Sequence, residues 1–271
     1  MYDPSKLSEL IRFARVDAGS TVIDVYPGDG DWTRLFSDIV GPEGRVYSFV
    51  PAEVAHFKND PVGRMRTLAK EPGRENVEAV SANLVAMPEA TQSADVLWLH
   101  LFYHDLHTTL MEAKGATAAH FNRTVYERLK PGGAYVIVDH AAAAGSGTSE
   151  AQSLHRIDPA SVRKEVEAAG FVLDAESNML ANKDDPHALK VFAQCRRNAR
   201  RKHRHPILRT LAIPHQDFSA LEVHVLYTQA QYLHDSHPRA VKQLRDQVIR
   251  ALKLSQYRRH LRLCQHDRQA L

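Results

Sequence analysis

Apolar segments of two kinds alternate along most of this chain. Short runs rich in β-branched residues are typical of buried parallel strands, whereas apolar residues spaced by three and four positions are typical of helices that cover a sheet. Strands are expected at residues 21–26, 45–50, 77–81, 95–101, 134–139 and 171–176, and helices at 5–14, 32–40, 106–129 and 161–169. This order predicts an α/β fold, a Rossmann-like doubly wound sandwich of three layers.

The first strand leads into a glycine turn and a helix, in the segment VIDVYPGDGDWTRLF at 22–36. Gly28 and Gly30 allow a tight turn, after which free N–H groups of the helix can face a nucleotide-like ligand. Both NAD(P) and S-adenosylmethionine are held by turns of this kind. A dinucleotide site requires a third glycine where Thr33 stands, and an acidic residue at the end of the second strand, where residues 49–51 are neutral.

A second segment, LKPGGAYVIVDH at 129–140, resembles the entry to the fifth strand of class I S-adenosylmethionine-dependent methyltransferases. The first motif of that family matches at three of four positions, since Asp24, Gly28 and Gly30 are present and Tyr26 replaces the first glycine. The segments FYHDLH at 102–107 and LHRID at 154–158 are similar to those of a group of predicted bacterial methyltransferases. The resemblance runs from about residue 14 to residue 192, and it implies the methyltransferase fold and S-adenosylmethionine as cofactor.

The resemblance also implies which residues hold the cofactor. Asp24 would accept a hydrogen bond from the amino group of the cofactor or from a bridging water; the alternative is a carboxylate that caps a loop. Asn83 would bind the adenine amino group, and the Leu84 amide would be available to a ring nitrogen. The missing acid after the second strand leaves the ribose without a partner, and Glu53 is a guess for that role. The predicted cofactor-binding residues are Asp24, Tyr26, Gly28, Gly30, Asn83, Leu84 and His100.

Methyl transfer requires alignment of donor and acceptor and, for a protonated acceptor, a base. The segment 103–107 lies where this fold presents such groups, and a neutral imidazole with a pKa of about 6.5 can take a proton. The alternative for His104 is a packed loop histidine paired with Asp105. We expect the end of the fifth strand to line the acceptor pocket together with His155. The predicted catalytic residues are Tyr103, His104, Asp105, Asp139 and His140.

Several other classes of ligand are not expected. Residues 100–103 lack the prolines of the motif that methylates amino groups of DNA, and the histidines and carboxylates lack metal-ligand spacing, so no metal is predicted. Cys195 and Cys264 also lack such spacing, which is consistent with a reduced cytoplasm. The chain begins without a secretory signal and has no long apolar run, so we expect a soluble cytoplasmic protein with no membrane partner.

The composition changes near Cys195. Residues 1–195 carry 19 Lys and Arg against 27 Asp and Glu, a formal charge of −8, whereas residues 196–271 carry 16 against 5, a formal charge of +11. We therefore predict a methyltransferase domain at 1–194 and a basic, mostly helical extension at 195–271. One interpretation of the basic cluster at 196–205 is an arm that binds RNA. The apolar spacing at 241–252 predicts an amphipathic helix that docks on the domain or on a partner.

A different interpretation of the extension is translation in a shifted frame. The methyltransferase sheet normally has a seventh strand after the sixth, and LKVFA at 189–193 is too short to be a convincing equivalent. The leading hypothesis is methyl transfer from S-adenosylmethionine to a small molecule at oxygen, carbon or sulfur. The alternatives are a non-catalytic binding protein that keeps the fold, with an RNA-binding tail, and an NAD(P)-dependent oxidoreductase.

Overall fold

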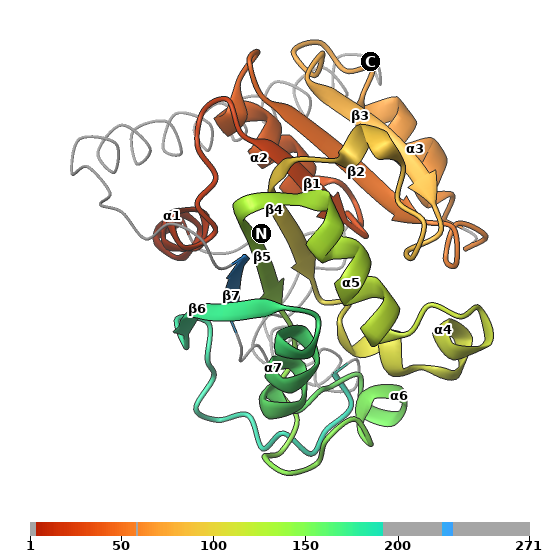
Figure 1. Ribbon diagram of the computed structural model, residues 1–271, viewed down its shortest axis with the longest axis vertical. Coiled ribbons are helices and arrows are strands. Elements are labelled where there is room, and N and C mark those ends of the chain that lie inside the picture. Colours follow the sequence, from red (N-terminus) through yellow and green to blue (C-terminus); the bar gives the residue numbers. More distant parts are fainter. Residues whose placement is uncertain (1–3, 58, 192–223, 230–271) are drawn as a thin grey trace, which may run out of the picture.

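The computed structural model describes residues 4–57, 59–191 and 224–229 (Figure 1). Its strands are β1 Thr21–Val25, β2 Arg45–Pro51, β3 Val77–Ala82, β4 Ala94–His100, β5 Leu129–Val138, β6 Phe171–Ser177 and β7 His224–Gln229. Its helices are α1 Pro4–Phe13, α2 Asp31–Val40, α3 Pro61–Leu68, α4 Thr109–Ala113, α5 Ala118–Arg128, α6 Ala151–Leu154 and α7 Pro159–Ala168. Single 3₁₀ turns lie at Glu89–Thr91 and His104–His107. All six predicted strands are present, with ends that differ by one or two residues from the prediction, except at the start of β5.

The strands form one sheet in the order β3-β2-β1-β4-β5-β7-β6. The five strands from β3 to β5 pair in parallel, with Val22 opposite both Val46 of β2 and Val96 of β4. Helices cover both faces, which confirms the Rossmann-like doubly wound fold. Because the chain leaves β1 and β4 toward opposite sides of the sheet, the carboxyl ends of these two neighbours form the switch point where ligands bind in such folds.

A seventh strand, which the sequence analysis did not identify, completes the sheet. β7 runs antiparallel to both of its neighbours, with Leu226 opposite Val136 of β5 and Ala175 of β6. It lies within the predicted extension, so this part of the extension belongs to the sheet. The frame-shift hypothesis concerns the coding frame beyond residue 193 and stays a hypothesis that the coding DNA tests. The basic cluster at 196–205 and the predicted helix at 241–252 lie outside the described residues.

The segment LKPGG, which precedes the strand expected at 134–139, is itself part of that strand. It is the first half of β5, with an irregularity in its pairing: Ala94 lies opposite Leu129, but Val96 lies opposite Ala134. The extra residues of β5 bulge out between these two pairs. A Cβ atom at Gly133 would lie 2.9 Å from the Lys130 carbonyl oxygen and 3.0 Å from that of Ala94, so the bulge requires glycine there.

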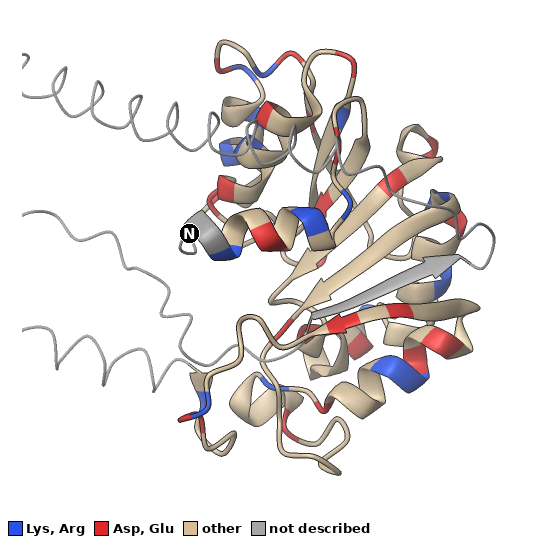
Figure 2. Cartoon of the chain, turned by 90° about the vertical axis from the view of Figure 1, so that its left-hand side faces the viewer, with Lys and Arg blue, Asp and Glu red and all other residues tan. Residues whose placement is uncertain are grey.

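Two apolar clusters fix the sheet between its helical layers. Alternate strand residues point to opposite faces, so Ile23 and Leu97 pack with α5 and α7, while Val22 and Val96 pack with α1, α2 and α3. Trp32 and Trp98 belong to the second cluster. In Figure 2 the positions of charged residues are coloured mainly on helices and loops, and the central strands are largely uncharged.

The helical segment expected at 106–129 is divided in the structure. Gly115 has a φ of 71° and separates α4 from α5.

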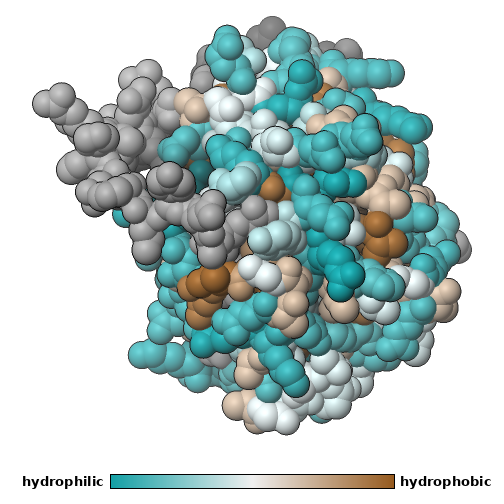
Figure 3. All heavy atoms as spheres, viewed as in Figure 1, coloured by the Kyte–Doolittle hydropathy of each residue, from teal (hydrophilic) through white to brown (hydrophobic). Residues whose placement is uncertain are grey.

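Figure 3 shows a mostly hydrophilic face interrupted by small hydrophobic groups. Within the described ranges, no helix has the length and apolar character needed to cross a membrane.

Candidate functional site

The turn after β1 carries the residues that the cofactor motif predicts. Tyr26 has a φ of 56°, a left-handed conformation that glycine adopts without strain and that other residues rarely adopt. Its ring lies 4.8 Å from the ring of Phe102, which follows β4. These two rings therefore meet at the switch point between the carboxyl ends of β1 and β4.

The two glycines of this turn have different requirements. Gly30 has a φ of 79°, and a Cβ atom there would lie 2.3 Å from Cδ1 of Leu68, so packing against α3 excludes a side chain. Gly28 has a φ of 59°, but a Cβ atom there would meet nothing within 4 Å. The backbone at Gly28 is thus open to a ligand that approaches the start of α2.

Asp24 lies under the turn rather than at its surface. Its side chain is buried, and the Thr33 hydroxyl donates a hydrogen bond of 2.6 Å to its Oδ2. Burial raises the pKa of Asp24 to about 7, although the hydrogen bonds from Thr33 lower it. A carboxyl group with this pKa changes its charge near neutral pH when a cation binds beside it.

The loops after β2 and β3 differ from the predicted arrangement. The sequence analysis expects the Leu84 N–H to be available to an adenine nitrogen. In the structure this N–H donates to both carboxylate oxygens of Glu53, at 3.1 and 3.3 Å. Glu53 is buried, whereas the neighbouring Asn83 is exposed at the sheet edge. His100, at the end of β4, stacks on Trp98 with a ring separation of 6.0 Å and lies 5.5 Å from the ring of Trp32.

The structure brings His104 and Asp139 together from the ends of two neighbouring strands. Nδ1 of His104 lies 2.7 Å from Oδ1 of Asp139, and the His104 backbone N–H donates to Oδ2 at 2.8 Å. Oδ1 also accepts the His140 backbone N–H at 2.7 Å. Since Asp139 accepts all three hydrogen bonds, Nδ1 of His104 carries a proton and Nε2 is the nitrogen left to act on a ligand.

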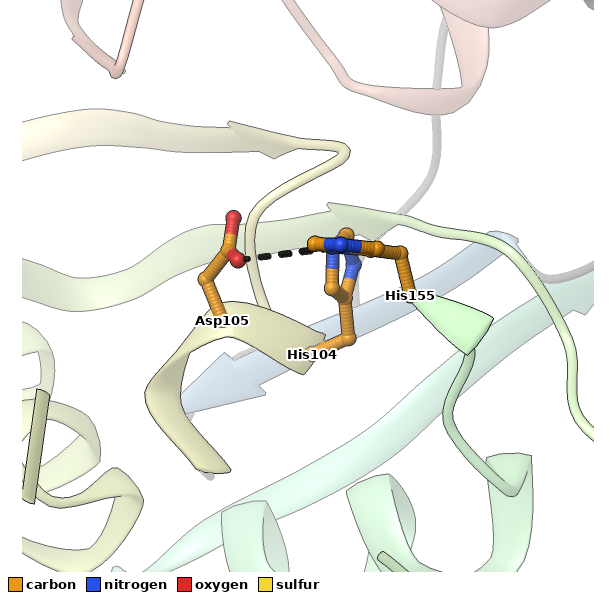
Figure 4. Close-up of side chains that lie close together, drawn as sticks. All are labelled: His104, Asp105 and His155. Carbon is orange, nitrogen blue, oxygen red and sulfur yellow. Dashed lines mark hydrogen bonds and ion pairs between the residues drawn. The ribbon is translucent and has the colours of Figure 1, made fainter. Parts of the chain in front are cut away.

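Two further side chains lie at Nε2 of His104 (Figure 4). Nδ1 of His155 is 3.3 Å away and Oδ1 of Asp105 is 3.6 Å away. The two imidazole rings are perpendicular, at an interplanar angle of 89°. Among the described residues, His104, Asp105 and His155 form a group whose ligand atoms all lie within 4.8 Å of one another, close enough to hold a metal ion.

Burial and the charges of neighbouring side chains shift the pKa values of these groups. Burial alone would raise the pKa of Asp139, but the charge of His104 and its hydrogen bonds outweigh this and hold that pKa below its usual value. Burial opposes the charge on His104, yet the carboxylates of Asp139 and Asp105 leave its pKa raised. Burial raises the pKa of Asp105 to about 6, and burial together with the charge of His104 lowers the pKa of His155.

The hydroxyl of Tyr103, one of the predicted catalytic residues, is hydrogen-bonded to other side chains of the protein. Its side chain is fully buried, the Asn122 amide donates to its hydroxyl at 2.8 Å, and the hydroxyl donates to Oε2 of Glu165 at 2.9 Å. Burial raises the pKa of Tyr103 well above its usual value. Nε2 of His107 also binds Glu165, at 3.0 Å. The 3₁₀ turn therefore directs Tyr103 and His107 toward α7, and His104 and Asp105 toward the sheet edge.

The remaining predicted residue of this region, His140, is buried, with its ring 6.5 Å from that of His104. Arg156 was not singled out by the sequence, and it fixes the segment that carries His155. Its fully buried guanidinium donates to the carbonyl oxygens of Ala141 and Leu189 and to both carboxylate oxygens of Asp185. The run LHRID gave no signal for this role beyond an arginine next to a histidine.

A cavity of about 700 Å³ lies beyond the end of β5. It is lined by Ala141, Ala142, Ala143, Ala144, Asp158, Pro159, Ala160, Arg163, Glu176, Pro186 and His187. None of these residues is among the predicted catalytic or cofactor-binding residues. We therefore define the site by the side chains around His104 and not by this cavity.

Known proteins resemble this chain in sequence and in fold. Demethylmenaquinone methyltransferase of Listeria welshimeri is 26% identical over 131 residues, 48% of this chain and 49% of that protein. The ubiquinone/menaquinone biosynthesis C-methyltransferase UbiE of Hahella chejuensis is 40% identical over 80 residues, 30% of each chain. The chain thus spans about half the length, or less, of the curated relatives that it matches.

Solved structures with the same fold include a candidate sarcosine dimethylglycine methyltransferase from Galdieria sulphuraria, with a TM-score of 0.55 and 15% identity over 83% of this chain and 84% of that one. The cyclase SpnF has a TM-score of 0.53 and 15% identity, over 83% of this chain and 79% of that one. These two likenesses concern the fold alone, which hosts more than one chemistry. The model of the ubiE/COQ5 methyltransferase family matches residues 6–156, more than half of the sequence, and the chain therefore belongs to the ubiE/COQ5 methyltransferase family.

Proposed function

We propose that the protein transfers a methyl group from S-adenosylmethionine to a small-molecule acceptor at carbon, oxygen or sulfur. The observation that carries the proposal is the His104–Asp139 pair, at the carboxyl ends of the strands next to the glycine turn. Family membership supports the methyl donor. The pair supports an acceptor that must lose a proton.

The turn after β1 fits the methionine part of the cofactor. The open space at Gly28 admits a ligand to the backbone, and the buried Asp24 carboxyl group is close enough to the turn to balance a cationic amino group. The cofactor supplies an activated methyl group when bound. Entry of the adenine at Leu84 requires that the N–H exchange its bond to Glu53 for a bond to the ring.

His104 is the residue that we propose to accept the proton of the acceptor. Asp139 fixes its ring and its tautomer, so the lone pair of Nε2 faces the space beside Asp105 and His155. The acceptor's proton moves to Nε2 as its electron pair forms the new bond to the methyl carbon, and the pair of the breaking carbon–sulfur bond stays on sulfur. The turn after β1 and the residues that follow β4 and β5 align the methyl donor with the acceptor, and this alignment supplies the rest of the rate acceleration.

The acceptor class follows from this chemistry. A base beside the methyl donor serves a phenol, an enol, a thiol or an acidic carbon, whereas an already nucleophilic amine does not need one. The curated relatives are named for demethylmenaquinone and for ubiquinone and menaquinone biosynthesis, as C-methyltransferases in the latter case. An aromatic or enolic acceptor with an ionisable hydroxyl group is therefore the first class to test.

Calorimetric titration of the full chain with S-adenosylmethionine, S-adenosylhomocysteine and NAD tests the cofactor. We expect binding of both sulfur compounds and none of NAD. Transfer of a labelled methyl group to a panel of phenols, enols and thiols then tests the reaction, with His104→Gln as the impaired variant and the exposed His56→Gln as its control. No heat with either sulfur compound would favour a non-catalytic binding protein, and binding of NAD alone would favour an oxidoreductase.

A further inference from the structure

The side chains around Nε2 of His104 suit a second kind of ligand. We propose that His104, Asp105 and His155 bind one divalent transition-metal ion of the zinc class, and that this ion excludes proton transfer to His104. The proposal concerns the protein before an acceptor binds. Metal binding depends only on the geometry of the three side chains. Its effect on proton transfer rests on the proposed function.

The distances between the ligand atoms match those of a tetrahedral zinc site. Zinc–nitrogen bonds of about 2.0–2.1 Å place neighbouring ligand atoms of a tetrahedron about 3.3–3.4 Å apart. Nε2 of His104 lies 3.3 Å from Nδ1 of His155 and 3.6 Å from Oδ1 of Asp105, and the remaining edge is 3.9 Å. Shifts of a few tenths of an ångström at Asp105 would complete three corners, with the fourth open to water.

The buried Asp139 orients the first ligand in the way typical of metal sites. A histidine that binds a metal through one nitrogen usually donates its other N–H to a carboxylate, which fixes the ring and increases its basicity. Nδ1 of His104 makes this hydrogen bond to Asp139 at 2.7 Å. Aspartate and two histidines are also ligands that zinc accepts in sites with an open position.

His155 is held in place by the backbone around it. It ends α6 in a left-handed conformation, with φ 55° and ψ 49°, which is strained for a residue other than glycine. The next two residues anchor it: Arg156 is bound to Asp185, and the Ile157 N–H donates to the carbonyl oxygen of His140 at 2.9 Å. The side chains of Asp105 and His155 are 26% and 23% exposed, so an ion can reach them from solvent.

The lone pair on Nε2 of His104 is needed both to bind the metal and to accept the proton of the acceptor. An Nε2 atom that binds a metal cannot accept a proton from a substrate. We therefore expect the metal-bound protein to be the inactive form, released by a chelator. The alternative explanation of the cluster is a simple N–H···N hydrogen bond between the two histidines.

The test is titration of the purified full chain with Zn²⁺ in competition with a chromophoric chelator, and with Co²⁺ while its visible absorption is recorded. The extension at 195–271 contains half of the 16 histidines and both cysteines, which can also bind zinc. The number of zinc ions bound must therefore be compared between variants. His155→Ala removes a ligand, Asp105→Asn changes one with little change in shape, and the exposed His56→Ala is the matched control.

We expect the wild type and His56→Ala to bind one more zinc ion than His155→Ala, and Asp105→Asn to weaken this site at least tenfold. The tetrahedral-type cobalt absorption of that site should disappear in His155→Ala. Circular dichroism checks that each variant is folded. If His155→Ala does not fold, zinc binding by Asp105→Asn tests the site instead. Equal zinc binding by all folded proteins would overturn the proposal, whatever the outcome of the methyl-transfer assay.

Discussion

The two halves of the site differ in the state of their polar groups. On the side of β1, β2 and β3, the groups that the motif assigns to a ligand already have partners within the protein: Asp24 binds Thr33, and the Leu84 N–H binds Glu53. On the side of β4 and β5, Asp139 holds His104 so that its outer nitrogen is directed at the ligand space. A cofactor must therefore exchange internal hydrogen bonds on its side of the site. An acceptor meets a ring that Asp139 already orients, and it displaces only the contact of Nε2 with Nδ1 of His155.

The strongest test of this contrast is Asp139→Asn. The variant keeps the size of the side chain but offers an amide to Nδ1 of His104, which disturbs the tautomer and the orientation of the ring. We expect kcat for methyl transfer to fall about 10²–10⁴-fold while the affinity for S-adenosylmethionine stays within about twofold. Steady-state kinetics and calorimetry measure the two quantities.

Asp184→Asn, at an exposed carboxylate, is the control and should behave as the wild type. An equal loss of cofactor affinity and of kcat in Asp139→Asn would mean that Asp139 supports the whole site and not His104 in particular. The thermal midpoint of each variant separates this result from unfolding.

The pH dependence of cofactor binding tests the other half. The pKa of Asp24 is raised to about 7, so the carboxyl group is mostly neutral at pH 6 and mostly ionised at pH 8. A cationic amino group prefers the ionised form, and the affinity for S-adenosylmethionine should rise about tenfold between these pH values, with release of a proton. Calorimetry in two buffers of different ionisation enthalpy detects that proton.

Asp24→Asn should abolish this dependence. The same carboxyl group affects stability, because a folded-state pKa above the usual 3.8 means that the native protein binds the proton more tightly than the unfolded chain. The free energy of unfolding contributed by Asp24 therefore decreases as the pH rises from about 4 to about 7. A pH-independent affinity in the wild type would show that Asp24 does not face the cofactor.

Glu53→Gln tests whether the bond at Leu84 competes with the cofactor. A neutral amide oxygen is a weaker acceptor than a carboxylate, so the Leu84 N–H should be released more easily and the affinity for S-adenosylmethionine should rise about threefold. The exposed Glu43→Gln is the control in the same titration. Weaker binding by Glu53→Gln would instead mean that this carboxylate contacts the cofactor.

The smallest effect on stability is expected for Tyr26→Gly. Relief of the left-handed conformation is worth about 1–2 kcal/mol, and loss of the ring contact with Phe102 costs about 0.5–1.5 kcal/mol. From these two contributions, the free energy of unfolding should change by between about −0.5 and +1.5 kcal/mol, which urea denaturation measures. In the calorimetric titration, tighter cofactor binding by Tyr26→Gly than by Tyr26→Phe would show that the ring obstructs the site, and weaker binding that it forms part of it.

The sequence predicts the sheet well because burial on both faces leaves a continuous apolar signal in each parallel strand, as in residues 95–99 of β4. It does not reveal β7, since HVLYTQ is short and its partner β6 ends 47 residues earlier. In the site, motif positions identify His104 and Asp139, both of which follow strands that pair in the sheet. The orientation of neighbouring side chains is not predictable in this way: one turn sends His104 to the sheet edge and Tyr103 into the core.

The place of β7 in the sheet has a consequence for synthesis of the chain. Both of its partners emerge from the ribosome before it, and β6 ends at Ser177 whereas β7 begins at His224. At about 5–20 residues per second, the 46 residues between these positions take about 2–10 seconds to translate. During that interval the backbone amides of β5 and β6 that later pair with β7 have no strand beside them, which makes the nascent protein most vulnerable to aggregation just before its sheet is complete.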